Sequence, residues 1–310
     1  MDLRIADYEV KTISKLIDTM NDLKFQFGTS SRGDNFIFRG VKDTNYSLIP
    51  NVFREYEGKV KVRSDTENNF VSGRIYLAAE SEILASFSKN ARTYLPPSLH
   101  DEDFLLLQYA QHYGVPTRLL DFTANPLVAL YFSCNGGAEK DGAIWVISIE
   151  PFQRWSFREP AGSDPAIEPF IRYSREELIN HIMEEVIDVT EFDEDYIKKQ
   201  RPVFFIPPYI DLRMSAQESR FLVWGSWHDP LNEMVDTNNF MKPIAGVRFE
   251  TFDDQSFLLK ITIPGSSKNS LLKELDLLGV NEKSIYPGLD GIGRYIKDRY
   301  RTDYDSGSWV

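Results

Sequence analysis

Residues 105 to 127 have the sequence LLLQYAQHYGVPTRLLDFTANPL. The segment begins as an apolar helix that Gly114 is well placed to end, and Asn125 followed by Pro126 is typical of the start of another helix. Between these signals it places two amides, a histidine, an arginine and an aspartate among residues typical of a core. Buried polar groups are costly unless they are paired, so we predict either a buried polar brace or the wall of a binding site.

The apolar pattern on either side of this segment predicts a mixture of helices and strands. Helices are expected at 8–25, 68–89, 104–113, 174–189, 266–278 and, in pieces, 284–300, strands at 36–38, 142–149, 203–206, 220–224 and 257–263, and a surface loop at 159–169. Because these elements do not alternate in a steady βαβ rhythm, we predict an α+β fold. We expect a single mixed α/β domain at residues 28–310, with a central, mostly antiparallel sheet flanked by helices, after an N-terminal helical extension at residues 1–27.

The composition restricts the classes of function. The chain of 310 residues has a formal net charge of −12, which argues against extended nucleic-acid binding but allows a local basic pocket for a small anion. Its one cysteine, Cys134, excludes an intramolecular disulfide and a thiol-rich zinc site, and we expect no metal. The sequence has no apolar run long enough for a membrane span and no secretory signal at its start, so we expect a cytoplasmic protein without a membrane partner.

Arg39 ends the strand expected at 36–38 and is followed by Gly40. A guanidinium group offers a planar set of donors suited to phosphate or carboxylate, and glycine lets a ligand or another backbone approach closely. Arg39 is therefore a candidate anion anchor. The alternative is a structural ion pair with a nearby acid such as Asp43, and composition alone favours it.

The central segment contains the next candidates. Gln108, Gln111 and His112 form a polar stripe on an otherwise apolar helix, where His112 either interacts with the negative end of the helix or acts as a base or donor toward a substrate. Alternating exposure places Arg118 on the rim of the core. There it either contacts an anion or a ribose, or pairs with Asp121 or with helix-end carbonyls as a buried brace.

A third polar cluster precedes the strand expected at 220–224. Gln217 and Glu218 could hold sugar hydroxyls and stabilise a developing positive charge at the entrance of this strand. The alternative is an exposed turn with a charge pair between Glu218 and Arg220. The chain contains no serine nucleophile elbow, no phosphate-binding P-loop and no GxGxxG dinucleotide motif.

Taken together, these motifs resemble the FRG domain family, which is named for its Phe-Arg-Gly motif. The matching residues are Phe38-Arg39-Gly40, the run from Gln111 to Thr123 with Asn125-Pro126-Leu127, the set Arg213, Gln217 and Phe221, and the run from Ser284 to Gly291. The resemblance covers most of residues 28–310, and the central motif is its most specific part. The family occurs in bacterial and phage proteins, sometimes in settings of conflict between phage and host.

The arginine-glycine strand of this family is similar to the first motif of arginine-type ADP-ribosyltransferases. This similarity implies NAD as a co-substrate, held by Arg39 and Gly40 with help from Gln111, Arg118 and Gln217, and it implies catalytic roles for Glu218 and His112. The corresponding expectation is an ADP-ribosyltransferase-like or NAD-glycohydrolase-like enzyme. The alternative expectation is a non-catalytic module that binds a nucleotide or a protein.

Overall fold

The computed structural model describes residues 8–26, 35–54, 69–96, 103–157, 201–225, 228–235 and 257–306. These residues form one seven-stranded sheet with the order β1-β7-β4-β2-β3-β6-β5. The strands are β1 Tyr8–Glu9, β2 Phe36–Val41, β3 Leu119–Thr123, β4 Gly142–Ser148, β5 Val203–Phe205, β6 Ser219–Val223 and β7 Leu258–Ile263. Only the β1–β7 pair is parallel, so the expected α+β fold with a mostly antiparallel sheet is confirmed.

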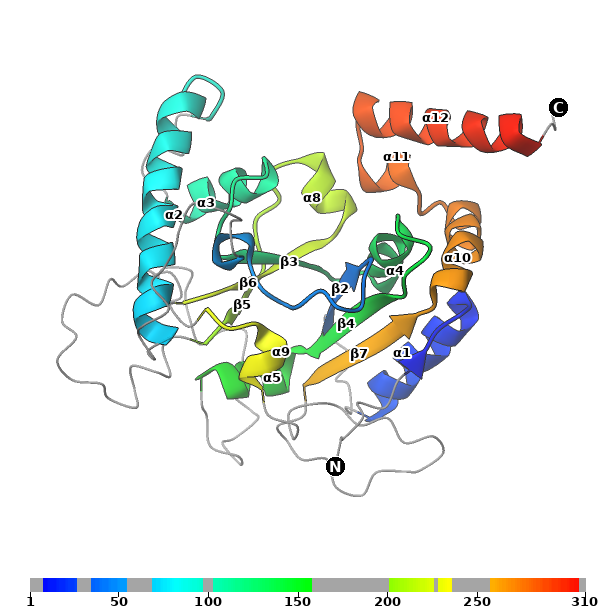
Figure 1. Ribbon diagram of the computed structural model, residues 1–310, viewed down its shortest axis with the longest axis horizontal. Helices are drawn as coiled ribbons and strands as arrows, with labels where there is room; N and C mark the ends of the chain where they lie inside the picture. Colours follow the sequence, from blue (N-terminus) through cyan, green and yellow to red (C-terminus); the bar gives the residue numbers. More distant parts are fainter. Residues whose placement is uncertain are drawn as a thin grey trace.

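Helices cover the sheet and its ends (Figure 1). They are α1 Ile13–Gln26, the 3-10 helix η1 Asn51–Phe53, α2 Asn69–Ala91, α3 Asp103–His112, α4 Pro126–Cys134, α5 Ile149–Phe157, α8 Leu212–Ala216, α9 Leu231–Met234, α10 Gly265–Leu277, α11 Glu282–Ile285 and α12 Leu289–Ser306. Among the described residues, no helix is long and apolar enough to cross a membrane.

Side-chain alternation along the strands builds separate apolar layers on the two faces of the sheet. Phe36 and Phe38 of β2 belong to the cluster shared with α1, α4 and α10, whereas Ile37 and Val41 belong to the cluster with η1, α5 and α9. A third cluster packs α3 and α8 on β3, β5 and β6, and it includes Leu119. The first face is therefore covered by two groups of helices, with α4 on one side and α3 and α8 on the other.

Several local signals in the sequence form the structures that they predict. Gly114 follows α3 with a φ of 80°, and Gly279 follows α10 with a φ of 81°, as expected for glycines that end helices. The side chain of Asn125 accepts a hydrogen bond from the backbone N–H of Leu127, and Pro126 occupies the first turn of α4. These signals need only neighbouring residues, which is why they could be found without the fold.

The start of the chain differs from the prediction of one helix at 8–25. Tyr8–Glu9 instead forms β1 beside β7, and α1 begins only at Ile13. Leu16 of α1 is buried in the same cluster as residues of β4, β7 and α10, and the domain boundary at residue 27 stays a prediction. The loop expected at 159–169 and the helix expected at 174–189 lie outside the described residues.

Gly40 is required by the contact between β2 and α4. A Cβ atom at this position would lie 1.8 Å from the carbonyl oxygen of Ala129 and 2.8 Å from the backbone nitrogen of Ser133. Glycine at this position was expected to admit either a ligand or another backbone, and the group that approaches it closely is the backbone of α4. The contact places α4 directly over β2, and this helix forms one wall of the pocket described below.

Candidate functional site

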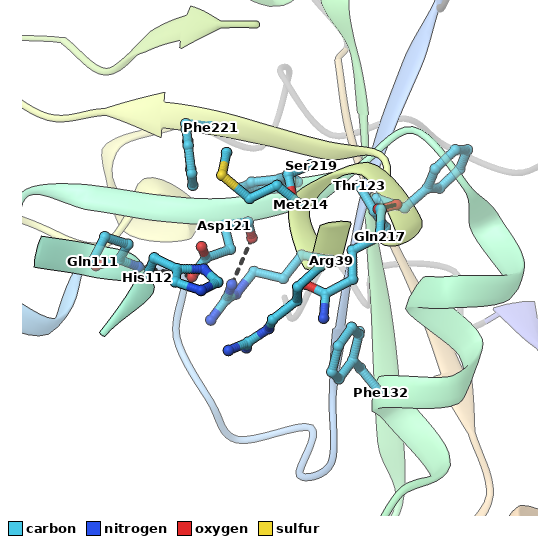
Figure 2. A pocket seen from close by; sticks show the side chains of 14 residues that line it. Arg39, Gln111, His112, Asp121, Thr123, Phe132, Met214, Gln217, Ser219 and Phe221 are labelled. Atoms are coloured by element: carbon cyan, nitrogen blue, oxygen red, sulfur yellow. Dashed lines mark hydrogen bonds between the residues drawn. The ribbon is translucent and has the colours of Figure 1, made fainter. Parts of the chain in front are cut away.

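A pocket of about 270 Å³ opens on the first face of the sheet, between α4 and the pair α3 and α8. Gln111 and His112 lie on one side of it and Phe132 on the other, with Arg39 and Asp121 between them (Figure 2). The full lining is Phe38, Arg39, Gly40, Gln111, His112, Asp121, Phe122, Thr123, Phe132, Arg213, Met214, Gln217, Ser219 and Phe221. Of the residues proposed for the site, the structure therefore brings Arg39, Gly40, Gln111, His112 and Gln217 together.

The pocket lies where β2 and β3 separate. These two strands share one register pair, Phe38 with Thr123, whereas β2 pairs with β4 over all six of its residues. Beyond that single pair, the side chain of Arg39 spans the opening, and its Nη1 donates a hydrogen bond to the carbonyl oxygen of Asp121 at 2.5 Å. Beyond the pair of Phe38 and Thr123, a hydrogen bond from the Arg39 side chain thus replaces the backbone hydrogen bonds that would continue the pairing of β2 with β3.

Arg39 keeps unused donor capacity in this position. Its Nε is enclosed and has no hydrogen-bond partner among the described residues, although a guanidinium group carries five N–H donors. Burial lowers the pKa of Arg39, while the nearby carboxylate of Asp121 raises it and the positive charge of Arg54 lowers it. An arginine nevertheless stays protonated, so the pocket contains a fixed positive charge. The ion pair expected with Asp43 is wrong, because Asp43 is held by Lys140 Nζ at 2.7 Å.

The carboxylate of Asp121 is exposed and held in a defined orientation. Its Oδ2 accepts a hydrogen bond from Gln111 Nε2 at 2.8 Å, and the oxygen of the same amide accepts one from the Thr117 hydroxyl at 2.6 Å. Because Thr117 supplies a donor, the amide of Gln111 must direct its nitrogen toward Asp121. The polar stripe on α3 therefore contributes to the pocket through Gln111.

His112 joins the two helices that form one side of the pocket. Its Nε2 lies 2.6 Å from Asp211 Oδ2, and the other carboxylate oxygen of Asp211 accepts the backbone N–H of Met214 at 2.8 Å. The residue at the end of α3 is thus tied to the N-cap of α8. A catalytic role for His112 stays a prediction.

Arg118 is directed away from the pocket and is not part of its lining. The side chain is buried, and Arg118 donates to both carboxylate oxygens of Glu80 on α2, from its backbone N–H at 2.6 Å and from its Nε at 2.5 Å. Its predicted rim position and the predicted pair with Asp121 are therefore wrong, whereas the predicted buried brace is present with another partner. Gln108 is likewise buried and outside the lining.

Glu218 is also outside the lining of the pocket. It has a φ of 47°, its carboxylate accepts a hydrogen bond from Asn125 Nδ2 at 3.0 Å, and its carbonyl accepts the backbone N–H of Ala124 at 3.0 Å. These contacts connect the turn before β6 to the start of α4. Arg220 Nη1 donates to the carbonyls of Glu218 and Ser219.

The C-terminal part of the chain contacts α8, which together with α3 forms one side of the pocket. Gln217 Nε2 donates to the carbonyl of Ile285 at 3.1 Å, and the guanidinium of Arg213 lies 4.9 Å from the ring centre of Tyr286. Arg294 of α12 lies at the same distance from that ring. Sequence reasoning did not include Arg213 or Asp121 among the proposed site residues, although both belong to the quoted motifs. The signal was present there, but it did not indicate which motif residues share a cavity.

The described residues contain no group of three histidine, cysteine, aspartate or glutamate side chains that could hold a metal ion. Comparison with family models finds the FRG domain at residues 34–142. Neither the comparison with curated proteins nor the comparison with solved structures gives a match. The matched span includes β2, α3, β3 and α4, and with them Arg39, Gln111 and Asp121, while Arg213 and Gln217 lie beyond it. Residues 34–142 thus match the FRG domain, and this segment supplies the strand opening, with Arg39 and Asp121, around which the pocket is built.

Proposed function

We propose that the pocket binds a small phosphate-bearing ligand of the nucleotide class, with NAD as the first candidate. The observation that carries this proposal is the guanidinium of Arg39, which lines the pocket while its one hydrogen bond among the described residues uses Nη1. The remaining Nη–H donors of the guanidinium can give charge-assisted hydrogen bonds to a phosphate oxygen.

Charge and size support the same class of ligand. The chain as a whole is acidic, yet Arg39 and Arg213 both line this pocket, and Arg54 is close enough to affect the pKa of Arg39. A volume of about 270 Å³ is slightly below the range of about 300–1,000 Å³ that is usual for small-molecule sites. It suits one half of a dinucleotide, with the other half outside, and Phe132 offers an aromatic surface within the lining.

Cleavage of NAD, as in a glycohydrolase or an ADP-ribosyltransferase, is the second candidate function. Loss of nicotinamide leaves a positively charged ribose that a carboxylate can stabilise. Glu218, which the family resemblance implied for this role, is outside the lining, whereas the carboxylate of Asp121 is within it. The specific observation in favour of this candidate is therefore the placement of Asp121 beside Arg39.

The test measures binding and turnover separately. Isothermal titration of the full chain with NAD, AMP and inorganic phosphate should show binding that Arg39→Ala weakens about ten-fold or more, because a charge-assisted hydrogen bond is lost. Arg92→Ala is the matched control, since Arg92 is exposed and outside the pocket. Nicotinamide release from NAD, followed by chromatography, tests turnover in the same samples. Absence of binding by all three compounds at millimolar concentration would refute the proposal.

A further inference from the structure

Asp121 is the one carboxylate among the described residues that line the pocket. An exposed acid inside an anion site requires an explanation, because it repels the phosphate that the arginines attract. The side chain is not merely a partner for Arg39, since Arg39 Nη1 donates to the backbone carbonyl of Asp121. Its carboxylate is instead held by Gln111, which is held by Thr117.

The arrangement places an acceptor of fixed orientation next to a cationic donor group. Asp121 Oδ2 is used by Gln111, and a carboxylate has about four lone-pair positions, so the side chain can accept further hydrogen bonds from the pocket. Figure 2 shows Asp121 and the guanidinium of Arg39 close together between α3 and Phe132. A ligand that fits both residues has an anionic group and, near it, hydroxyl donors.

We propose that the Asp121 carboxylate accepts hydrogen bonds from the sugar hydroxyls of a ligand whose phosphate is bound by Arg39. This inference rests on the proposed nucleotide-binding function and deepens it, because it defines the substrate class as a phosphorylated sugar or nucleotide with a free vicinal diol. Carboxylates are suited to this role because an ionised carboxylate only accepts hydrogen bonds and can accept from both hydroxyls of a ribose.

The geometry assigns this role to Asp121 and not to Glu218. The carboxylate of Glu218 is bound to the amide of Asn125, the N-cap of α4, and it is outside the lining. The side chain of Asp121 lies on the same face of β3 as Leu119 and Thr123, which is the face on which the pocket opens. Strand alternation thus fixes its direction.

The test compares AMP with 2′,3′-dideoxy-AMP, which has the same base and phosphate but neither ribose hydroxyl. Titrations use wild type, Asp121→Asn and Asp18→Asn. Asp18 is the matched control, because it lies exposed on α1 and outside the pocket and loses the same charge. Wild type should bind AMP about ten-fold more tightly than the dideoxy compound, as expected for hydrogen bonds to a charged group.

In Asp121→Asn this preference should shrink to about two-fold or less, with the dideoxy compound bound at least as tightly as in wild type because the repulsion of its phosphate is removed. That second result also shows that the variant is folded around the pocket. Equal binding of the two compounds by wild type, or an unchanged preference in Asp121→Asn, would overturn the role of Asp121 while leaving nucleotide binding intact. If neither compound binds to wild type, this inference fails, and the proposed function fails with it only where NAD and inorganic phosphate do not bind either.

Discussion

Replacing Gly40 with alanine should destabilise the fold strongly, because the added Cβ meets backbone atoms. The new atom would lie 1.8 Å from the carbonyl oxygen of Ala129 and 2.8 Å from its carbonyl carbon. Relief requires a shift of α4 relative to β2 of more than 1 Å, since van der Waals contact begins near about 3.5 Å. Overpacking of this kind costs about 3 kcal/mol, the upper part of the usual range.

Thermal unfolding followed by circular dichroism measures this cost. At about 2 °C per kcal/mol, the Tm of Gly40→Ala should fall by about 6 °C. Gly293→Ala is the control, because a Cβ at Gly293 in α12 meets nothing within 4 Å and alanine favours a helix. Its Tm should therefore equal or slightly exceed that of wild type.

The same variant separates the two explanations of Gly40. If the missing side chain serves a ligand instead of α4, Gly40→Ala will keep the Tm of wild type and lose AMP binding. That outcome would refute the packing argument. If Gly40 is required by the backbone of α4, the Tm of Gly40→Ala will be lower than that of wild type, and more of the variant will be unfolded at a given temperature.

Two further predictions concern charged groups. Glu80→Ala should lower the free energy of unfolding in urea by about 3–5 kcal/mol, because it leaves Arg118 buried without its carboxylate partner, and a loss below about 1 kcal/mol would contradict the buried brace. The hydrogen bond from Lys140, followed by that from the backbone N–H of Asn45, lowers the pKa of Asp43. Its folded pKa is then below its unfolded pKa, so the contribution to stability is complete above about pH 4 and is lost as the pH falls through the folded value. The Tm difference between wild type and Asp43→Asn should accordingly be present at pH 7 and shrink as the pH falls below about 4, and a difference that grows on acidification would be inconsistent with this sign.

The elements of the fold could be predicted where the determining information is local. The C-terminal ends of α3 and α10 follow from Gly114 and Gly279, and the start of α4 follows from Asn125-Pro126. The strands at 142–148 and 258–263 follow from short segments rich in apolar residues. The two-residue strand β1 was missed because its hydrogen bonds to β7 reach a partner about 250 residues away. Periodicity within residues 8–25 contains no information about such a partner.

The site was predicted less completely, because its side chains find partners across the sheet. The sequence offers Asp121, three residues away, as one possible partner for Arg118, whereas the structure pairs Arg118 with Glu80 on another helix. Arg39 and Asp121 meet only because β2 and β3 separate after a single register pair, and strand pairing is not visible in either segment alone. The family resemblance pointed to motifs whose residues in part line the pocket, but it could not distinguish Asp121, which lines the pocket, from Glu218, which does not.

The opening between β2 and β3 leaves the two halves of the sheet, β1-β7-β4-β2 and β3-β6-β5, joined by a single register pair. On the face with η1 and α5, one apolar cluster continues across both, from Ile37 to Leu120 and Leu222. On the pocket face, the two halves have separate clusters, and Arg39 is a bridge between them. A molecule bound there contacts both halves of the sheet where they meet. Its binding affinity therefore depends on how firmly the two halves are held together, as well as on its own contacts.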